Sequence, residues 1–245
     1  MNPGSVRDTS PFHVRVLDSA SQLLLAQTTT LPIVPSTEFE TADLQQLSLE
    51  PSNPTVQEAS SLRLSLLTTN GLSADARIEI KFPTEIGLAS GFSAQTLTVQ
   101  TMKLSAICSV SPASSLVVLS DLFYSYGYDP DMDKVLKLDL IDIISKNPAS
   151  VKPNLAFTVT TLDLFDGAFS AVDSTELVIA EFNKAGSLTD FQIVFDNSFS
   201  NFYPTDAIVT FKAVHDAPLG SLIRIRFPKD FKLENVGVEA ITGFQ

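Results

Sequence analysis

Apolar and polar positions alternate along much of this chain. A leucine triplet separated by polar residues, Leu62, Leu64 and Leu66, is followed by a second inward triplet, Ile78, Ile80 and Phe82. A period of two is typical of a β-strand with one buried face. Alternation or short apolar runs predict further strands over residues 12–16, 23–25, 97–100, 104–110, 116–123, 135–144, 157–161 and 177–180. Eight or so strands in roughly 130 central residues is typical of a two-sheet sandwich.

Turn and breaker residues predict how these strands are joined. Asn70-Gly71, after Thr69, fits the positive φ of a tight hairpin between the two triplets. Pro83 ends the second strand, and the prolines in Leu31–Pro35 predict a linker, because proline removes a ladder donor. We expect strands near Leu47–Glu50 and Gln192–Asp196 to lie at junctions between units.

The sequence repeats itself. Asn147-Pro148-Ala149-Ser150 matches Asn2-Pro3-Gly4-Ser5 at a spacing of 147 − 2 = 145 positions. The same spacing relates Arg77–Pro83 to Leu222–Pro228. A spacing that is kept far along the chain indicates one domain type in tandem.

The repeat divides the chain into three predicted parts. Residues 1–40 are the C-terminal part of one repeat, 41–185 are a complete β-sandwich repeat, and 186–245 are the N-terminal part of the next. Met1 corresponds to Lys146, in the middle of a unit, so we expect the chain to be an internal piece of a longer array. The partial unit at 186–245 lacks most of one sheet, and we expect further chain or a neighbour to complete it.

Composition supports an all-β fold and excludes some partners. The sequence contains many short runs of Val, Ile, Leu, Phe and Thr and lacks long helical tracts. The net charge is −12, so a basic footprint for nucleic acid is missing and binding to an anionic membrane is disfavoured. The sequence contains no transmembrane helix pattern, and no signal peptide opens it. A single cysteine, Cys108, rules out an intrachain disulfide. We expect it to be a small buried apolar residue, and the alternative is a reactive or intermolecular thiol.

A family resemblance rests on four stretches: Asn70–Ala74, Ile78–Pro83, Leu136–Ile144 and Asn147–Thr161. Their order resembles the immunoglobulin-like β-sandwich repeats of very large surface proteins, in bacterial and archaeal surface layers and adhesins and in long surface proteins of ciliated protists. The resemblance implies tandem immunoglobulin-like sandwiches of 145-residue period. It implies an extracellular, cell-surface role that is not enzymatic. It carries over no functional residue.

The search for catalytic chemistry finds little. The two histidines, His13 and His215, correspond to Thr158 and Asn70, so neither is present in both copies of the unit. No nucleophile elbow, zinc-binding His-Glu-x-x-His, phosphate-cradling loop or Cys-x-x-Cys pair occurs. We therefore expect no enzymatic activity and no cofactor.

The best candidate metal site is acidic. Asp129, Asp131 and Asp133 offer oxygen ligands suited to calcium, but the Gly and Glu of a helix-loop-helix calcium site are missing. The alternative is a solvated acidic turn. A second candidate is a calcium site that stiffens a unit junction, formed by Asp163, Asp166 and Asp173, of which only Asp163 has an acidic counterpart.

A tyrosine cluster is the candidate interface. Tyr124, Tyr126 and Tyr128 alternate, and such a face could contact a neighbouring subunit or a glycan. The alternative is a strand end with half-buried rings.

Two functions remain open from the sequence. The first is a structural repeat module of a filament, stalk or layer, whose partners are adjacent repeats or copies of itself. The second is an adhesin module that binds a glycan or protein through the loop at 124–133. Largest contacts at the two ends would favour the first, and a polar-aromatic pocket would favour the second.

Overall fold

The fold is described from a computed structural model of residues 1–245. The structure describes residues 12–17, 24–31, 40–96, 102–103, 107–151, 154–165, 167–179, 182, 184–196, 206–217 and 220–229. These residues contain strands and a single short 3₁₀ helix, and no α-helix. The expected all-β class is therefore confirmed.

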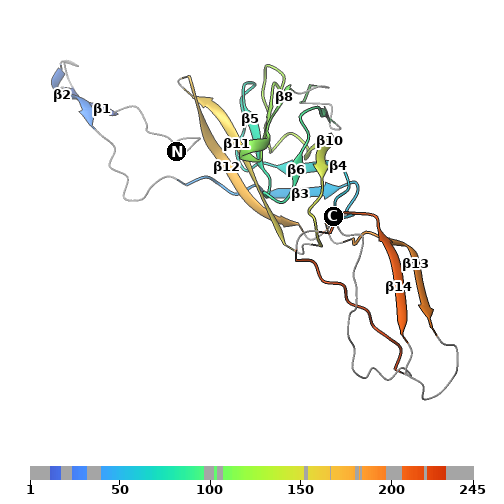
Figure 1. The fold of residues 1–245 in the computed structure, drawn as a ribbon. Coiled ribbons are helices and arrows are strands. Elements are labelled where there is room, and N and C mark those ends of the chain that lie inside the picture. The colour runs from blue at the N-terminus through green and yellow to red at the C-terminus, as the bar shows by residue number, and fades with distance from the viewer. Residues whose placement is uncertain are drawn as a thin grey trace. The chain divides into compact units, whose positions relative to one another are not determined.

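The first sheet of the central region is built around a long strand, β10 (Leu136–Lys146). The order is β3-β4-β10-β6, with β7 also paired to β10. Here β3 is Gln46–Pro51, β4 is Ser60–Leu67, β6 is Gly87–Leu88 and β7 is Ser93–Thr96. All these pairs are antiparallel, and the strand order places β3 at an edge of this sheet (Figure 1).

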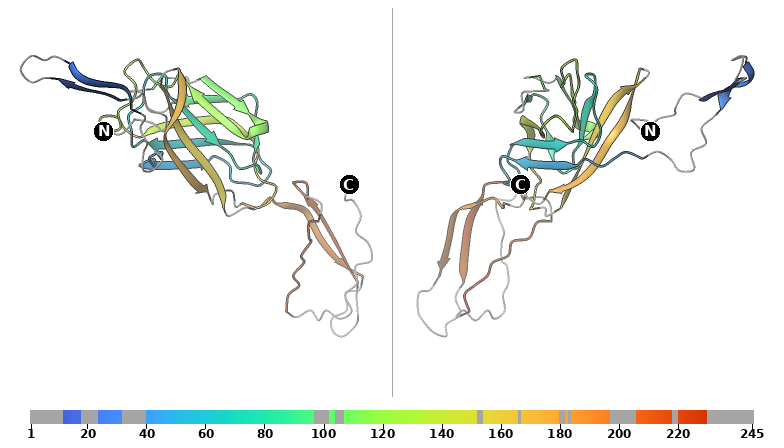
Figure 2. Two further views of the ribbon diagram at one scale, coloured as in Figure 1. Left: turned by 90° about the vertical axis from the view of Figure 1, so that its left-hand side faces the viewer. Right: turned by 180° about the vertical axis from the view of Figure 1, so that it is seen from behind.

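The second sheet has the order β12-β11-β5-β9-β8. Its strands are β12 (Ala168–Ile179), β11 (Leu155–Phe165), β5 (Arg77–Lys81), β9 (Leu116–Ser120) and β8 (Ile107–Ser111). The 3₁₀ helix Pro112–Ser114 joins β8 to β9. Figure 2 shows the strands of the two sheets from two further directions.

Both sheets turn their apolar positions into one core. Leu62, Leu64 and Leu66 from β4 and Ile78 and Ile80 from β5 are all buried, as the alternation predicts. Phe82 meets Phe157 of β11 edge-to-face at 5.2 Å between ring centroids. Burial of side chains from both sheets in one cluster is the packing of a β-sandwich.

Two further hairpins lie outside these sheets. One pairs β1 (Phe12–Leu17) with β2 (Leu24–Leu31), and the other pairs β13 (Leu188–Phe195) with β14 (Ala207–Ala213). Within the described part of the chain, each is a 2-stranded sheet. The strand expected near residues 192–196 is thus present as β13, and the one near 47–50 as β3.

Strand boundaries differ from the expectations in places. β2, β11 and β12 are longer than the runs that predicted them, because the strand ladder also includes polar residues outside those runs, such as Asp163 and Glu176. The short strands β6 and β7 had no clear pattern and were not expected. The predicted strand at 97–100, part of the one at 104–110 and the predicted linker at 32–35 lie outside the described residues.

The predicted hairpin turn at Asn70-Gly71 is wrong. β4 pairs with β3 and β10, whereas β5 pairs with β11 and β9 in the other sheet. Residues 68–76 therefore cross from one sheet to the other. An Asn-Gly pair marks a change of direction, but it does not determine which strand the chain pairs with next.

The second copy of the inward triplet also differs from the expectation. No strand forms over residues 221–228, and Ile223 and Ile225 are 47% and 43% exposed. These residues belong to a separate compact unit, Asp216–Gln245. β5 pairs with β9 and β11, whereas residues 221–228 have no partner strand among the described residues.

Candidate interaction surfaces

The tyrosine cluster separates into two environments. Tyr124 and Tyr126 are 38% and 67% exposed, and their rings stack at 5.9 Å between centroids. Tyr128, which the alternation predicted to share this face, is only 3% exposed. The physical reason is Gly127, whose φ of +72° closes a turn from Tyr124 and directs the next side chain inward.

Tyr128 packs in the core instead. Its backbone exchanges two hydrogen bonds with Leu72, at 2.9 and 2.8 Å, and its ring lies 5.9 Å from that of Phe123. Its hydroxyl is buried close to Thr68. Burial, and then the negative charge of Asp133, raise the pKa of Tyr128 to about 12, while the polar groups of Thr68 oppose that rise. Tyr128 therefore fixes the crossing between the sheets.

The acidic loop binds its own backbone. The amide of Asp129 donates to an Asp133 carboxylate oxygen at 2.7 Å, and the amide of Asp131 donates to Asp129 Oδ1 at 3.0 Å. In the part of the chain that the structure describes, no group of three or more His, Cys, Asp or Glu side chains could hold a metal ion. Asp129, Asp131 and Asp133, the three predicted calcium ligands, thus lie in one loop but do not form a group that could hold a metal ion.

The predicted junction aspartates bind a loop of their own sandwich. Asp163 accepts hydrogen bonds from the amide of Ser73 at 3.0 Å, from the Ser73 hydroxyl, and from the amide of Leu164 at 2.8 Å. Asp173 accepts from Asn70 Nδ2 at 2.7 Å. Burial raises the pKa of Asp173, while the donors from Asn70 oppose that rise. Asp166 lies outside the described residues.

The repeated Asn-Pro stretch has a clear structural role. Asn147 is buried, and its Nδ2 donates to the carbonyl oxygens of Asn53 and Thr55, both at 2.7 Å. Its amide donates to the Glu58 carbonyl at 2.8 Å, and the amide of Gln57 donates to the Pro148 carbonyl at 3.1 Å. The stretch therefore clamps the loop between β3 and β4. Sequence reasoning singled it out as a repeat but missed this role.

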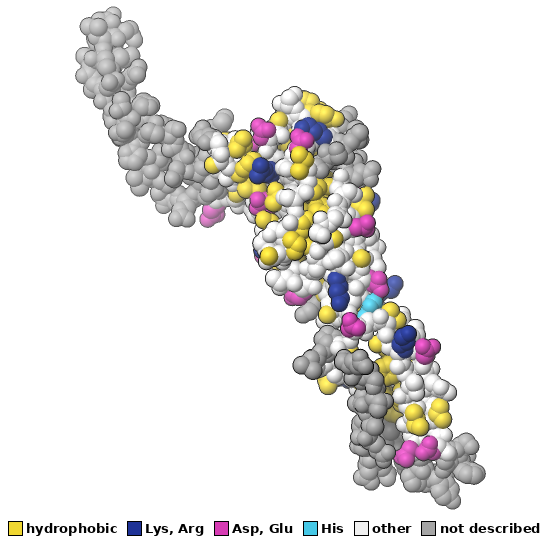
Figure 3. All heavy atoms as spheres, turned by 45° about the horizontal axis from the view of Figure 1, so that its top comes forward, with side chains coloured by type: hydrophobic (Ala, Val, Ile, Leu, Met, Phe, Trp, Pro, Cys, Tyr) yellow, Lys and Arg dark blue, Asp and Glu magenta, His cyan; other side chains and the backbone are white. Residues whose placement is uncertain are grey.

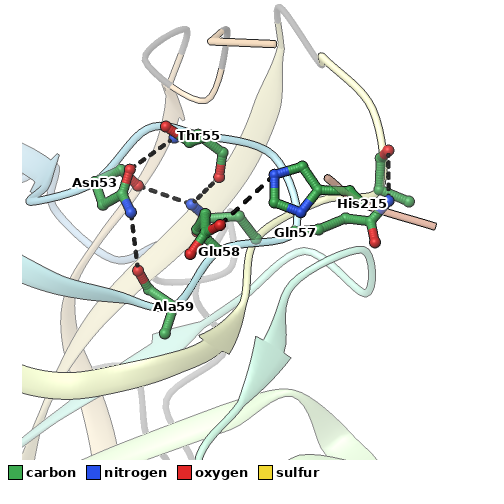
Figure 4. Close-up of polar contacts among 8 residues, drawn as sticks. Asn53, Thr55, Gln57, Glu58, Ala59 and His215 are labelled. Carbon is green, nitrogen blue, oxygen red and sulfur yellow. Dashed lines mark hydrogen bonds and ion pairs between the residues drawn. The ribbon is translucent and has the colours of Figure 1, made fainter. Parts of the chain in front are cut away.

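The same loop holds the chain where it leaves the second sheet. The amide of Val56 donates to the Lys184 carbonyl at 3.0 Å, and Thr55 and Lys184 form a parallel bridge. On its outer side, Glu58 lies 3.6 Å from His215 Nε2 (Figure 4). Asn53 orders the loop by accepting from the amide of Thr55 at 3.1 Å. The side chain of the other histidine, His13, lies outside the described residues.

Cys108 is half-buried against the edge of the core. Burial raises the pKa of its thiol, and a backbone hydrogen bond from Ala94 opposes that rise. The thiolate is the reactive form, so this environment favours a packing role.

The surface charges are dispersed. Arg63 and Asp139 form an exposed pair at 2.8 Å across β4 and β10. Figure 3 shows Lys and Arg side chains scattered singly over the face in view. Among the described residues, no helix has the length and hydropathy to cross a membrane.

Comparison with known proteins yields a structural neighbour and no family. No protein-family model matches the sequence, and no curated protein matches it. A solved structure, the N-terminal domain of the Streptococcus gordonii adhesin Sgo0707, matches with a TM-score of 0.33 and 7% identity. The match covers 55% of this chain and 32% of that one.

Proposed function

We propose that this chain is a structural repeat module of a large extracellular surface protein, which forms a filament, stalk or layer through end-to-end contacts between sandwiches. The observation that carries the proposal is the pairing of the two outer hairpins. In β1, the register shifts between Phe12 and Val14 and again between Val16 and Leu17. In β11 it shifts between Thr161 and Leu162, which matches the second of these shifts at a spacing of 161 − 16 = 145. The outer strand pair therefore repeats an irregularity of the complete sandwich.

The second outer hairpin supports the same interpretation. In the sandwich Leu49 pairs with Leu64, and in β13–β14 Ile193 pairs with Val209. The spacings are 193 − 49 = 144 and 209 − 64 = 145, so the register of the second hairpin differs by one residue, and the position that matches Leu49 at 145, Val194, pairs with Ile208 instead. In this interpretation, β1–β2 is the last hairpin of the preceding unit and β13–β14 is the first hairpin of the following unit. Such an order is expected in an array of tandem repeats.

The strand order supports an immunoglobulin-like sandwich within the proposal. Immunoglobulin-type domains place strands A, B, E and D in one sheet and C, F and G in the other. Here β3, β4, β10 and β6 follow the first order, and β12, β11 and β5 follow the second in reverse. The pair β8–β9 extends the second sheet beside β5 as an insertion before β10.

The proposal assigns no enzymatic activity. The buried polar side chains Asp163, Asp173 and Asn147 are all used to hold loops of the sandwich. This geometry supports a stiff sandwich, because charge-assisted hydrogen bonds to loop amides restrict the movement of the segments that connect the two sheets.

Force spectroscopy on a polypeptide with several copies of residues 41–185 tests the proposal. Each copy should unfold separately and release a constant length, about 480–520 Å for 145 residues before the folded length is subtracted. An Ile78→Ala change in one copy should lower the unfolding force of one step without changing its length. Unequal steps, or extension without resistance, would contradict the proposal.

An adhesin module is the alternative, favoured by the stacked and exposed rings of Tyr124 and Tyr126. Exposed aromatic faces contact sugars and protein partners well. A glycan panel probed with the wild type, Tyr126→Ala and a control change at the exposed Ile107 of β8 tests it. Binding lost only in Tyr126→Ala supports the alternative, and no binding by the wild type speaks against it.

A further inference from the structure

A histidine contacts the sandwich at the end of the β13–β14 hairpin. His215 comes shortly after β14, and its side chain is 15% exposed. Its Nε2 atom is 3.6 Å from a carboxylate oxygen of Glu58, in the loop between β3 and β4 (Figure 4). Both residues belong to the same compact unit, Met1–His215. The pair therefore joins two segments that are 215 − 58 = 157 positions apart in the sequence.

The backbone around this pair leaves room for the imidazole. Gly186 lies against the ring, and a Cβ atom there would overlap it, 2.9 Å from Nε2. The amide of Val214 donates to the Ser187 carbonyl at 3.4 Å, so the segments before β13 and after β14 lie together. In the loop, the amide of Val56 donates to the Lys184 carbonyl at 3.0 Å. The loop is thus connected to the chain at both ends of the hairpin.

The side chain at this repeat position is titratable in one copy and neutral in the other. The counterpart of His215 is Asn70, which donates to Asp173 at 2.7 Å. Histidine gains a proton as pH falls from about 8 to about 5, whereas glutamate stays ionised down to about pH 4.5. Between these limits His215 and Glu58 become oppositely charged, and an electrostatic attraction is added to the contact.

The neighbouring charges do not change over the same range. Besides His215 and Glu58, the segments 53–58, 184–187 and 212–216 carry the charged residues Lys184, Lys212 and Asp216. The two lysines stay positive and the aspartate stays negative between about pH 5 and pH 8. A change in pH therefore acts on this contact through protonation of His215.

We propose that protonation of His215 strengthens a latch between the β3–β4 loop and the β13–β14 hairpin, so that the hairpin is held more firmly to the sandwich at acidic pH than at neutral pH. The latch consists of the His215–Glu58 pair and the two backbone hydrogen bonds of Val56 and Val214. This inference rests on the proposed function in one respect, because the hairpin is taken there as the start of the following unit. It goes beyond that function by making the stiffness of the connection depend on pH.

Hydrogen exchange of the 245-residue chain, followed by NMR at about pH 5.5 and about pH 8, tests the latch. Each observed rate is divided by the intrinsic rate of an unprotected amide at that pH, which gives a protection factor. The amides of Val56 and Val214 should be about two- to fivefold better protected at the lower pH, the effect expected of a partly exposed ion pair. The amide of Phe82, which donates to the Ser115 carbonyl within the sandwich, should keep the same protection.

Three variants remove the attraction in different ways. Glu58→Gln has nearly the same shape, and His215→Asn introduces the side chain found at the matching position 70. Gly186→Ala keeps both charges but displaces the imidazole. Each should abolish the gain in protection at the lower pH. Matched controls that should keep the full gain are His13→Asn, which removes the other histidine, and Glu176→Gln, at an exposed position of β12.

Circular dichroism and the urea midpoint check that every variant is folded. Equal protection at the two pH values in the wild type overturns the inference. So does a gain that persists in any of the three latch variants, or one that disappears in His13→Asn. Repeated copies of residues 41–185 do not contain position 215, so failure of the force measurement is distinguishable from failure of this one.

Discussion

One alternating pattern occurs in two places and has two outcomes. Arg77–Pro83 forms β5, with Ile78 and Ile80 fully buried. Leu222–Pro228 repeats the pattern, yet forms no strand and leaves Ile223 about half exposed, at 47%. From the second residue onward, the two stretches have the same order of apolar and charged residues, so the difference is attributed to their surroundings.

The surroundings differ in partner strands. β5 has β11 on one side and β9 on the other, and the opposite sheet covers its inner face. Backbone groups of a strand need partners, and apolar side chains need a second layer. The β14 strand is an intermediate case, because it has a partner in β13 but its apolar positions stay partly exposed. Strand formation and burial are thus separate steps.

The largest expected effect comes from the same substitution made in both stretches. Ile78→Ala should lower the free energy of unfolding by about 2–5 kcal/mol, because it leaves a cavity in a packed core. Ile223→Ala, at the matching position 223 − 78 = 145 residues later, should change it by no more than about 0.5 kcal/mol. Urea unfolding followed by circular dichroism measures both. Equal costs would show that the two stretches share one environment.

A second matched pair probes the loop contacts. Asn70→Ala removes a donor to the buried carboxylate of Asp173 and should cost about 1–3 kcal/mol. Its repeat counterpart His215 lies 3.6 Å from the partly exposed Glu58, so His215→Ala should cost no more than about 1 kcal/mol. Unfolding curves of the two variants at neutral pH and low salt make the comparison. A larger loss in His215→Ala would contradict the assignment of the stronger contact to Asn70.

The smallest effect is a pH dependence confined to the complete sandwich. The pKa of Asp173 is raised above its ordinary 3.8, and the counterpart at 173 − 145 = 28 is Thr28. As pH rises through this range, the unfolded chain releases the proton before the folded one does. The stability of the wild type should therefore fall relative to Asp173→Asn as pH rises from below 3.8 through the raised value, and then level off. A stability difference that grows in the opposite direction would show that the hydrogen bonds from Asn70 outweigh burial.

The sequence predicted the positions that alternate and missed those that depend on long-range pairing. The buried triplets at Leu62–Leu66 and Ile78–Phe82 follow directly from a period of two. β6 and β7 are held by pairing with β10, and the short runs 87–88 and 93–96 carry little pattern of their own. The tyrosine cluster was likewise predicted only in part, because Tyr128 turns inward as a result of the positive φ at Gly127.

By itself, the sequence determined that this protein is built from alternating strands and that a stretch of it recurs after 145 residues. Both are local properties, because side-chain periodicity and residue identity need no knowledge of the partner. Only the tertiary structure decided that the segment containing Asn70 crosses from one sheet to the other and that Asp163 and Asp173 bind this segment. It also decided that Asn147 holds the loop between β3 and β4. Those contacts join residues about 90 or more positions apart, and the hydrogen bonds that select them exist only once both sheets are in place.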